Sequence, residues 1–323
     1  MRAVPSRDRW GKGTVYARVS FRASSLALVS LALALAACGG GSGGPAAPTA
    51  PATSQTLRLV SGFDHAVAVP ALDVHVEGQP YVTDGAGTLT AAVATGSRIS
   101  TSGARGFIDR ETTYAGDNDF PLWPLQGAWD TSYYRTIVYD RPWAKGMGPL
   151  LRPEPGVYTV SASWDIRSDP EALDRVGAAL SEVARLTRGA ITFRWVEADG
   201  DVTYEISETD RLIGSNWGVN ALRTRGNTIT GCRIIIRRLD VARLNVALHE
   251  TGHFLGLCHS PDPRDVMCVA AGRSYTSTRL GPGEESAWLM MAQRRPGNRF
   301  PDRDPGVVGA AASPDTIVIR CGG

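Results

Sequence analysis

The chain has 323 residues, of which 43% are hydrophobic and 20% are charged. This composition is typical of a folded protein and argues against wholesale disorder, a polytopic membrane protein and a coiled-coil rod. Six of the 34 Lys and Arg residues lie within the first 37 positions, so the rest of the chain, which carries most of the 32 Asp and Glu residues, is slightly acidic. A basic, nucleic-acid-binding body is therefore not expected.

The N-terminal region combines a basic start with an apolar run over residues 23–37. This run is too short to cross a membrane as a permanent helix and suits the core of a signal peptide. The segment Leu35-Ala36-Ala37-Cys38 resembles the lipobox of bacterial lipoproteins. The resemblance implies a signal peptide over 1–37, a lipid on Cys38, and a cell-envelope protein, periplasmic or at the cell surface, held to a membrane by that lipid. An ordinary signal peptide cut nearby, with Cys38 incidental, is the alternative.

Residues 38–54 are rich in Gly, Pro and Ala and contain no large apolar side chain, so they are expected to form a flexible tether. Residues 55–125 consist of short alternating segments separated by turn signals such as Asp84-Gly85, which predicts a small all-β sandwich. The segment resembles the carboxypeptidase-regulatory-like modules found beside secreted bacterial enzymes. Residues 126–155, rich in Pro and Trp, are expected to connect this module to a second domain.

Residues 156–323 mix predicted strands and helices, which indicates an α+β domain. Strands are expected at 157–160, 191–196 and 234–236, and one further strand at 316–319. Asp169 followed by Pro170 predicts the start of a helix, and Gly189 its end. Two more helices are expected at 239–255 and 283–294, the first of them packed against a twisted sheet.

The densest chemical signal is the pattern H-E-x-x-H-x-x-G-x-x-H over residues 249–259. His249 and His253 are four residues apart, so on a helix they share one face and can reach one tetrahedral metal ion. His259 would lie roughly 15 Å beyond His249 on a continuous helix. The chain must therefore turn back, and Gly256 is where a positive φ is tolerated. Three neutral imidazoles leave one coordination position open, as in a catalytic zinc site.

This pattern is similar to the signature of the metzincin clan of zinc endopeptidases, and Ser260 after the third histidine resembles the matrixin branch. The resemblance implies a Zn²⁺ held by His249, His253 and His259, Glu250 as general base, and Met267 as the apolar floor of a Met-turn. Protein or peptide substrates would be hydrolysed by zinc-activated water. The alternatives are a structural zinc and a surface adhesin or binding protein that retains zinc without turnover.

Four cysteines remain once Cys38 is set aside, an even number in an oxidising compartment. We expect disulfides Cys258–Cys268 and Cys232–Cys321, the first clamping the loop of the third histidine to the Met-turn. The alternative is a thiolate that fills the fourth zinc position, as in the zymogen switch of matrixins. Arg320-Cys321-Gly322 faintly resembles the core of that switch, although it lies at the opposite end of the chain.

Residues 116–119 could cradle a structural Ca²⁺, but an acidic turn is the commoner meaning because a full twelve-residue loop is absent from the sequence. The sequence does not indicate an oligomeric state.

Overall fold

The computed structural model describes residues 51–103, 106–124, 131–141, 146–207, 217–237, 244–268, 278–305 and 314–321. The predicted signal peptide, Cys38 and residues 39–50 of the predicted tether lie outside the described residues. The chain divides into two units, Met1–Pro48 and Thr49–Gly323, and every described helix and strand belongs to the second. Among the described helices, none is long and apolar enough to cross a membrane.

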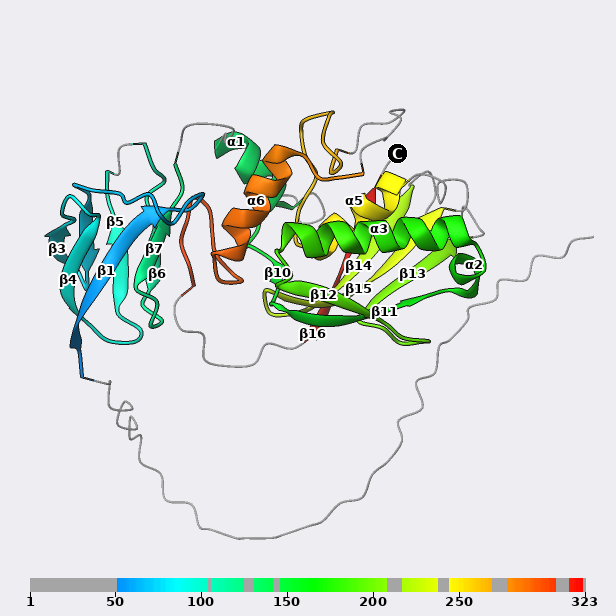
Figure 1. Cartoon of the computed structure of the whole chain (residues 1–323), viewed down its shortest axis with the longest axis horizontal. Coiled ribbons are helices and arrows are strands. Elements are labelled where there is room, and N and C mark those ends of the chain that lie inside the picture. The colour runs from blue at the N-terminus through cyan, green and yellow to red at the C-terminus, as the bar shows by residue number, and fades with distance from the viewer. Residues whose placement is uncertain are drawn as a thin grey trace, which may run out of the picture. The chain divides into compact units, whose positions relative to one another are not determined.

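Residues 53–124, here called the β module, form two small sheets around a core of their own (Figure 1). In β4, the buried residues Leu89, Ala91 and Val93 alternate with residues turned outward, the period of a half-buried strand. The sheet orders are β4-β1-β7 and β3-β2-β5-β6. The strands are β1 (Thr53–Ser61), β2 (Asp73–Val76), β3 (Gln79–Val82), β4 (Thr88–Val93), β5 (Arg98–Thr101), β6 (Glu111–Thr113) and β7 (Asp119–Leu122).

The larger sheet is built from strands between residues 152 and 321 and has the order β12-β11-β13-β15-β14-β16, with β10 beside β15. Neighbours among β11, β12, β13 and β15 run parallel, whereas β14 is antiparallel to both β15 and β16. The strands are β10 (Arg152–Pro153), β11 (Gly156–Ala162), β12 (Ile191–Trp195), β13 (Val202–Ser207), β14 (Gly218–Arg225), β15 (Thr228–Arg237) and β16 (Pro314–Cys321). This mixed sheet with its helices confirms the predicted α+β class.

Helix α3 (Pro170–Leu186) follows the predicted signals closely. The Asp169 side chain accepts hydrogen bonds from the backbone N–H groups of Glu171 and Ala172, and Pro170 occupies the first turn. Val176, Leu180 and Val183 form its buried stripe. Helix α3 packs against α5 (Leu244–Phe254) over the sheet, as Figure 1 shows. Residues 239–243 of the predicted second helix lie outside the described residues.

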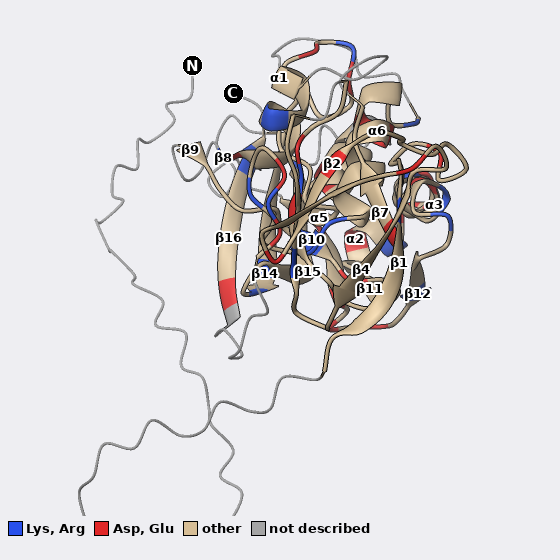
Figure 2. Ribbon diagram, turned by 90° about the vertical axis from the view of Figure 1, so that its left-hand side faces the viewer, with Lys and Arg blue, Asp and Glu red and all other residues tan. Residues whose placement is uncertain are grey.

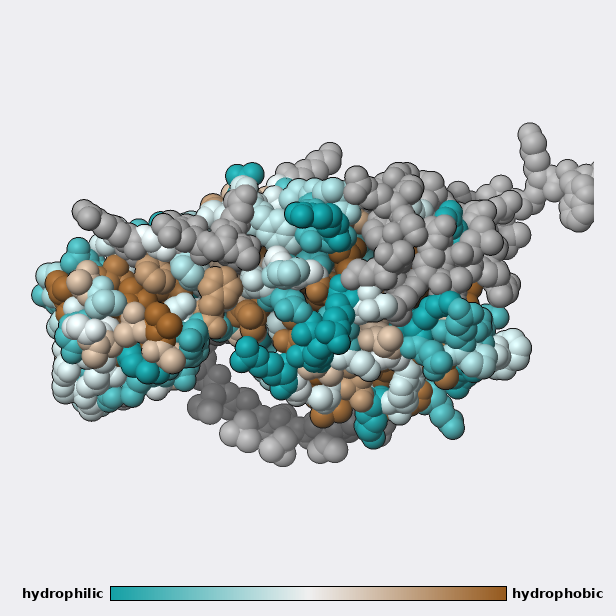
Figure 3. All heavy atoms as spheres, turned by 45° about the horizontal axis from the view of Figure 1, so that its top comes forward, coloured by the Kyte–Doolittle hydropathy of each residue, from teal (hydrophilic) through white to brown (hydrophobic). Residues whose placement is uncertain are grey.

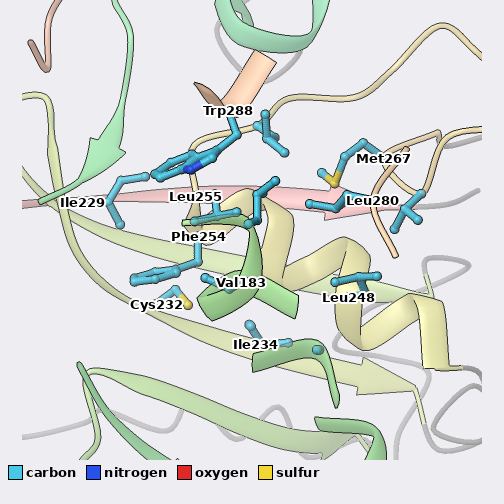
Figure 4. Packing of buried hydrophobic residues seen from close by; sticks show 14 of the residues in the cluster. Val183, Ile229, Cys232, Ile234, Leu248, Phe254, Leu255, Met267, Leu280 and Trp288 are labelled. Carbon is cyan, nitrogen blue, oxygen red and sulfur yellow. The ribbon is translucent and has the colours of Figure 1, made fainter. Parts of the chain in front are cut away.

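The sheet and helices enclose one continuous apolar core. Figure 4 shows Val183 of α3, Ile234 of β15, and Leu248 and Phe254 of α5 packed in this core, with Trp288 of α6 nearby. Helix α6 spans Pro282–Ala292, close to the prediction of 283–294. The burial of these side chains fixes the position of α5 relative to the sheet, and α5 carries the histidine motif.

The segment predicted as a connector contributes to this core as well. It contains α1 (Thr131–Tyr134), a π-helical turn η1 (Arg135–Tyr139), and the short strands β8 (Asp140–Arg141) and β9 (Gly146–Met147). Tyr134, Ile137, Val138 and Tyr139 are fully buried. Helix α2 (Trp164–Arg167) follows β11.

Polar bonds join the β module to the segment that follows α6. Asp304 accepts hydrogen bonds from Arg110 at 3.1 Å and from Thr112 at 2.7 Å. Arg294 donates to both carboxylate oxygens of Asp302 at 2.6 Å, and also to the Pro121 carbonyl of β7 at 3.1 Å. Because the Arg294 and Asp302 side chains are fully buried, they form an ion pair in which each charge neutralises the other.

Charged residues of both signs occur throughout the described part of the chain. Basic and acidic residues are intermixed along the described ribbon in Figure 2. On the face seen in Figure 3, hydrophobic residues are interspersed with hydrophilic ones and gather over the β module.

Candidate metal centre

Helix α5 and the loop after it bring the three motif histidines together. The ring centroids of His249 and His253, one helical turn apart, are separated by 4.9 Å. The His259 ring lies 5.5 Å from that of His249 and 5.0 Å from that of His253. His249 and His253 are buried, and His259 is partly buried. The three rings therefore surround one point, as the spacing predicted.

The return of the chain toward α5 takes place at Gly256. Its φ is +92°, a conformation that L side chains rarely adopt. A Cβ added at this position would lie 1.8 Å from the carbonyl oxygen of Leu151. Glycine is required here both for its backbone angle and for its lack of a side chain, and without this turn His259 could not face its two partners.

Hydrogen bonds orient the imidazoles of α5. The Nδ1 atoms of His249 and His253 lie 2.7 Å from the carbonyl oxygens of Val266 and Leu257, respectively. A carbonyl can only accept, so each Nδ1 carries the proton and each Nε2 keeps a lone pair. Nε2 of His249 is buried and has no hydrogen-bond partner among the described residues. Buried imidazole nitrogens with fixed lone pairs and backbone-bonded second nitrogens are what a zinc site requires, so these residues fit the ion.

The electrostatics of the cluster agree with that fit. Burial lowers the pKa of His249 to about 4, and burial together with the nearby His249 lowers the pKa of His259 to about 3. The pKa of His253 is also lowered, by burial and by the two other imidazoles. All three side chains are thus neutral near pH 7, the form that binds a metal.

Glu250 lies beside the histidines and is completely buried. Its Oε1 atom has no hydrogen-bond partner among the described residues, and burial raises its pKa to about 8. A Cβ added to Gly218, the first residue of β14, would lie 2.1 Å from this oxygen. Asn220 of the same strand donates to the Glu250 backbone carbonyl at 2.6 Å. The motif alone does not identify Gly218 or Asn220, because their role depends on how β14 packs against α5.

Met267 is fully buried in the turn that follows the third histidine. A Cβ added to Gly252 of α5 would lie 2.3 Å from the Met267 sulfur, so the methionine side chain packs directly against the helix between the two histidines. The Met267 N–H donates to Oε1 of Glu284 at 2.7 Å, which ties the turn to α6. Glu284 was not predicted from the sequence as part of the site.

The predicted disulfides are not formed. Cys232, Cys258, Cys268 and Cys321 are all outside any disulfide. Strand β14 lies between the strands of Cys232 and Cys321, and the strand register places their Cα atoms roughly 16 Å apart, well beyond the limit of about 7 Å for a disulfide.

In the other predicted disulfide, Cys258–Cys268, the two cysteines do not lie opposite each other. Cys268 lies opposite Ser260, two residues beyond Cys258, and the Cys258 sulfur accepts a hydrogen bond from Arg141 at 3.2 Å. The loop of the third histidine is instead joined to the Met-turn by the Ser260 N–H, which donates to the Met267 carbonyl at 2.9 Å.

Cys321 lies at the histidine cluster. Its Sγ atom is 3.1 Å from Nε2 of His253 and 3.5 Å from Nε2 of His259. The possible ligand atoms of Cys321 and the three histidines all lie within 4.8 Å of one another. This is the arrangement of the alternative in which a thiolate takes the fourth zinc position.

The structural Ca²⁺ at residues 116–119 stays a prediction. The Asp119 carboxylate is bound by the Arg58 guanidinium at 2.9 and 2.7 Å. A carboxylate neutralised in this way is a poor ligand for a cation.

The model of the matrixin family matches residues 77–280, more than half of the chain, including α5 and the Met-turn. The chain is also similar to the solved structure of archaemetzincin from Methanopyrus kandleri, with a TM-score of 0.31 and 14% identity over 42% of this chain and 95% of that chain. A comparison with curated proteins gave no match.

Proposed function

The chain belongs to the matrixin family, and we propose that it is a zinc-dependent endopeptidase of the bacterial cell envelope with Glu250 as its general base. The observation that supports this most strongly is the convergence of three imidazoles beside a buried carboxylate. Family membership confirms the metzincin-type resemblance and indicates zinc peptidase activity in general. The endopeptidase type, the role of Glu250 and the location in the envelope are our proposals.

His249, His253 and His259 would hold the ion through their Nε2 atoms. Bound there, zinc would act as a Lewis acid on the scissile carbonyl and acidify a water molecule. The backbone carbonyls that accept from Nδ1 would keep the rings in the required tautomer. The apolar packing of Met267 against Gly252 supports the position of the helix under the cluster.

Glu250 would move the proton. As a carboxylate it would accept a proton from the attacking water and pass it to the departing amine nitrogen. Burial alone favours its neutral form. A cation beside it would favour the charged form that a base requires, so the site is suited to proton transfer near neutral pH.

Strand β14 is suited to hold an extended substrate. It begins at Gly218, against Glu250, and its outer edge can form an antiparallel backbone ladder, as its pairing with β16 demonstrates. A peptide that pairs with this edge would pass close to the histidines. This supports an endopeptidase, because an extended ladder does not need a free chain end.

The test is hydrolysis of casein by the purified protein, measured in parallel with the Cys321→Ala variant because that thiol lies at the cluster. We expect one zinc per chain, loss of hydrolysis on chelation and recovery when zinc is restored. Glu250→Gln should retain zinc and lose roughly 10²- to 10⁴-fold in kcat. Hydrolysis that survives both chelation and Glu250→Gln would contradict the mechanism.

A zinc-containing surface adhesin or binding protein without turnover is the second candidate. The specific observation in its favour is Cys321, because four protein ligands are typical of a structural zinc site. If zinc is bound stoichiometrically and neither the wild type nor Cys321→Ala cleaves any protein substrate, this second function is the better one.

The envelope location is supported by the apolar run 23–37, the lipobox-like sequence before Cys38 and the polar tether, which would reach roughly 20–25 Å. We expect Cys38→Ser to release the protein from the membrane fraction. Retention of the variant on the membrane would contradict lipid anchoring.

A further inference from the structure

Strand β16 occupies the full length of the outer edge of β14. The two strands are antiparallel over eight residue pairs, from Gly218 opposite Cys321 to Arg225 opposite Pro314. Ile319 and Cys321 are buried, whereas Val318 and Arg320 between and beside them are exposed, so one face of β16 points to the core. Figures 1 and 2 both show β16 beside β14, at the edge of the sheet.

This strand ends at the histidine cluster. The Cys321 carbonyl accepts a hydrogen bond from the Trp217 N–H at 2.8 Å, which fixes the backbone at the strand end. The Cys321 side chain is buried, and its Sγ lies 3.1 Å from His253 Nε2 and 3.6 Å from Glu250 Oε2. The sulfur therefore contacts both the proposed metal ligand His253 and the proposed base Glu250.

With the Cys321 sulfur, the site has four possible ligands for one metal ion. Three imidazole nitrogens and one thiolate form one of the usual tetrahedral zinc sets. The thiol would coordinate as a thiolate, releasing its proton to solvent. A metal with four protein ligands has no position for a water molecule or a substrate carbonyl.

We propose that β16 is a built-in inhibitory strand, which covers the substrate-binding edge of β14 and provides Cys321 as a removable fourth metal ligand. The proposal rests on the peptidase function proposed above. Two contacts would inhibit the enzyme together. The β14–β16 ladder would occupy the edge where an extended peptide binds, and the Cys321 sulfur would occupy the open position of the metal.

Release of β16 would break a single strand ladder. Within the described residues β16 is the last strand of its sheet and pairs with β14 alone. Its release exposes one strand edge, and a peptide substrate can restore the same ladder. The histidines do not need to move, because their orientation comes from α5 and the carbonyls of Val266 and Leu257.

The first experiment compares the full chain with Cys321→Ala, Cys321→Ser and the control Cys232→Ala. Cys232 is equally buried but lies on β15, so its substitution tests the loss of a buried thiol alone. We expect both Cys321 variants to cleave casein on the order of tenfold faster than the wild type or more, since a tethered competitor acts at millimolar effective concentration. The control should remain at the wild-type rate. A wild type as fast as the Cys321 variants would overturn the inhibitory role.

The second experiment reads the metal directly, without activity. The zinc is replaced by Co²⁺, and the near-ultraviolet charge-transfer absorption of a sulfur–cobalt bond is measured. The wild type and Cys232→Ala should show this band, and both Cys321 variants should lack it while still binding one Co²⁺. Absence of the band from the wild type would overturn the assignment of Cys321 as a ligand.

The two experiments separate this proposal from the peptidase function. A sulfur band with no cleavage by any variant means that the thiol binds the metal but the peptidase function fails, and inhibition fails with it. If the wild type and all variants cleave at equal rates and the wild type shows no sulfur band, the peptidase function stands and β16 has no inhibitory role. A substitution that disrupts β16 as a whole gives an independent check, because Ile319→Asp should also raise the rate although it leaves the thiol in place.

Discussion

Helix α5 and strand β16 bring donor atoms to the same point, but the fold holds them in different ways. On α5, His249, Glu250 and His253 are buried within the domain core, and both histidines are fixed by backbone carbonyls. On β16, Cys321 lies at the end of a strand that pairs only with β14 among the described residues, and the outward side chains of this strand are exposed. The positions of the His249 and His253 nitrogens are thus fixed by the packing of the domain core. The position of the Cys321 sulfur depends only on the pairing of β16 with β14.

The largest effect on zinc binding and activity is expected when a metal ligand of α5 is removed. His253→Ala deletes a metal ligand and leaves the Leu257 carbonyl without its donor. We expect the zinc content to fall from one per chain to near zero and peptidase activity to disappear. Metal analysis after dialysis measures this. If His253→Ala kept stoichiometric zinc, the histidine cluster would not be the principal binding site.

Gly218→Ala tests the contact between β14 and Glu250. The new Cβ would lie 2.1 Å from Oε1, so the carboxylate must move. A displacement of about 1 Å at a reacting group can cost on the order of 10²-fold in rate. We expect such a loss in kcat with unchanged zinc content. Gly156→Ala is the matched control, because a Cβ at Gly156 of β11 meets no atom within 4 Å and the rate should not change.

Leu248→Ala addresses the packing of α5. Leu248 precedes His249 on α5 and is buried in the core shown in Figure 4. Truncation of a buried leucine typically lowers the free energy of unfolding by about 2–5 kcal/mol. Denaturant titration should detect this loss as a shift of the global transition. A stability equal to that of the wild type would mean that α5 is not held by the core.

Ile319→Ala makes the corresponding truncation on β16. Ile319 is as buried as Leu248, but its strand lies at the sheet edge. We expect β16 to detach locally, so that the global unfolding free energy falls by less than it does for Leu248→Ala. Amide hydrogen exchange should therefore become faster in β16 and remain unchanged in α5. Equal loss of protection in both elements would remove the distinction between them.

The parts of the site that depend on local spacing could be predicted from the sequence. His249 and His253 are related by one helical turn, and the position of Gly256 between them and His259 indicated where the chain must bend. The start of α3 at Asp169 and Pro170 could be predicted for the same reason, because helix capping involves residues that are adjacent in the sequence.

The parts that depend on strand register could not be predicted. The pairing of β16 with β14 joins residues about 100 positions apart in sequence, and it decides that Cys321 reaches the histidines and not Cys232. The approach of Gly218 to Glu250 has the same origin. An even number of cysteines suggested disulfides, but cysteine counts contain no information about register.

The anchoring of Asp304 by Arg110 and Thr112 fastens the chain to the β module ten residues before β16 begins. The buried ion pair of Arg294 and Asp302 belongs to the same junction. Detachment of β16 would therefore leave this junction intact, and the β module would keep its attachment to the segment that follows α6.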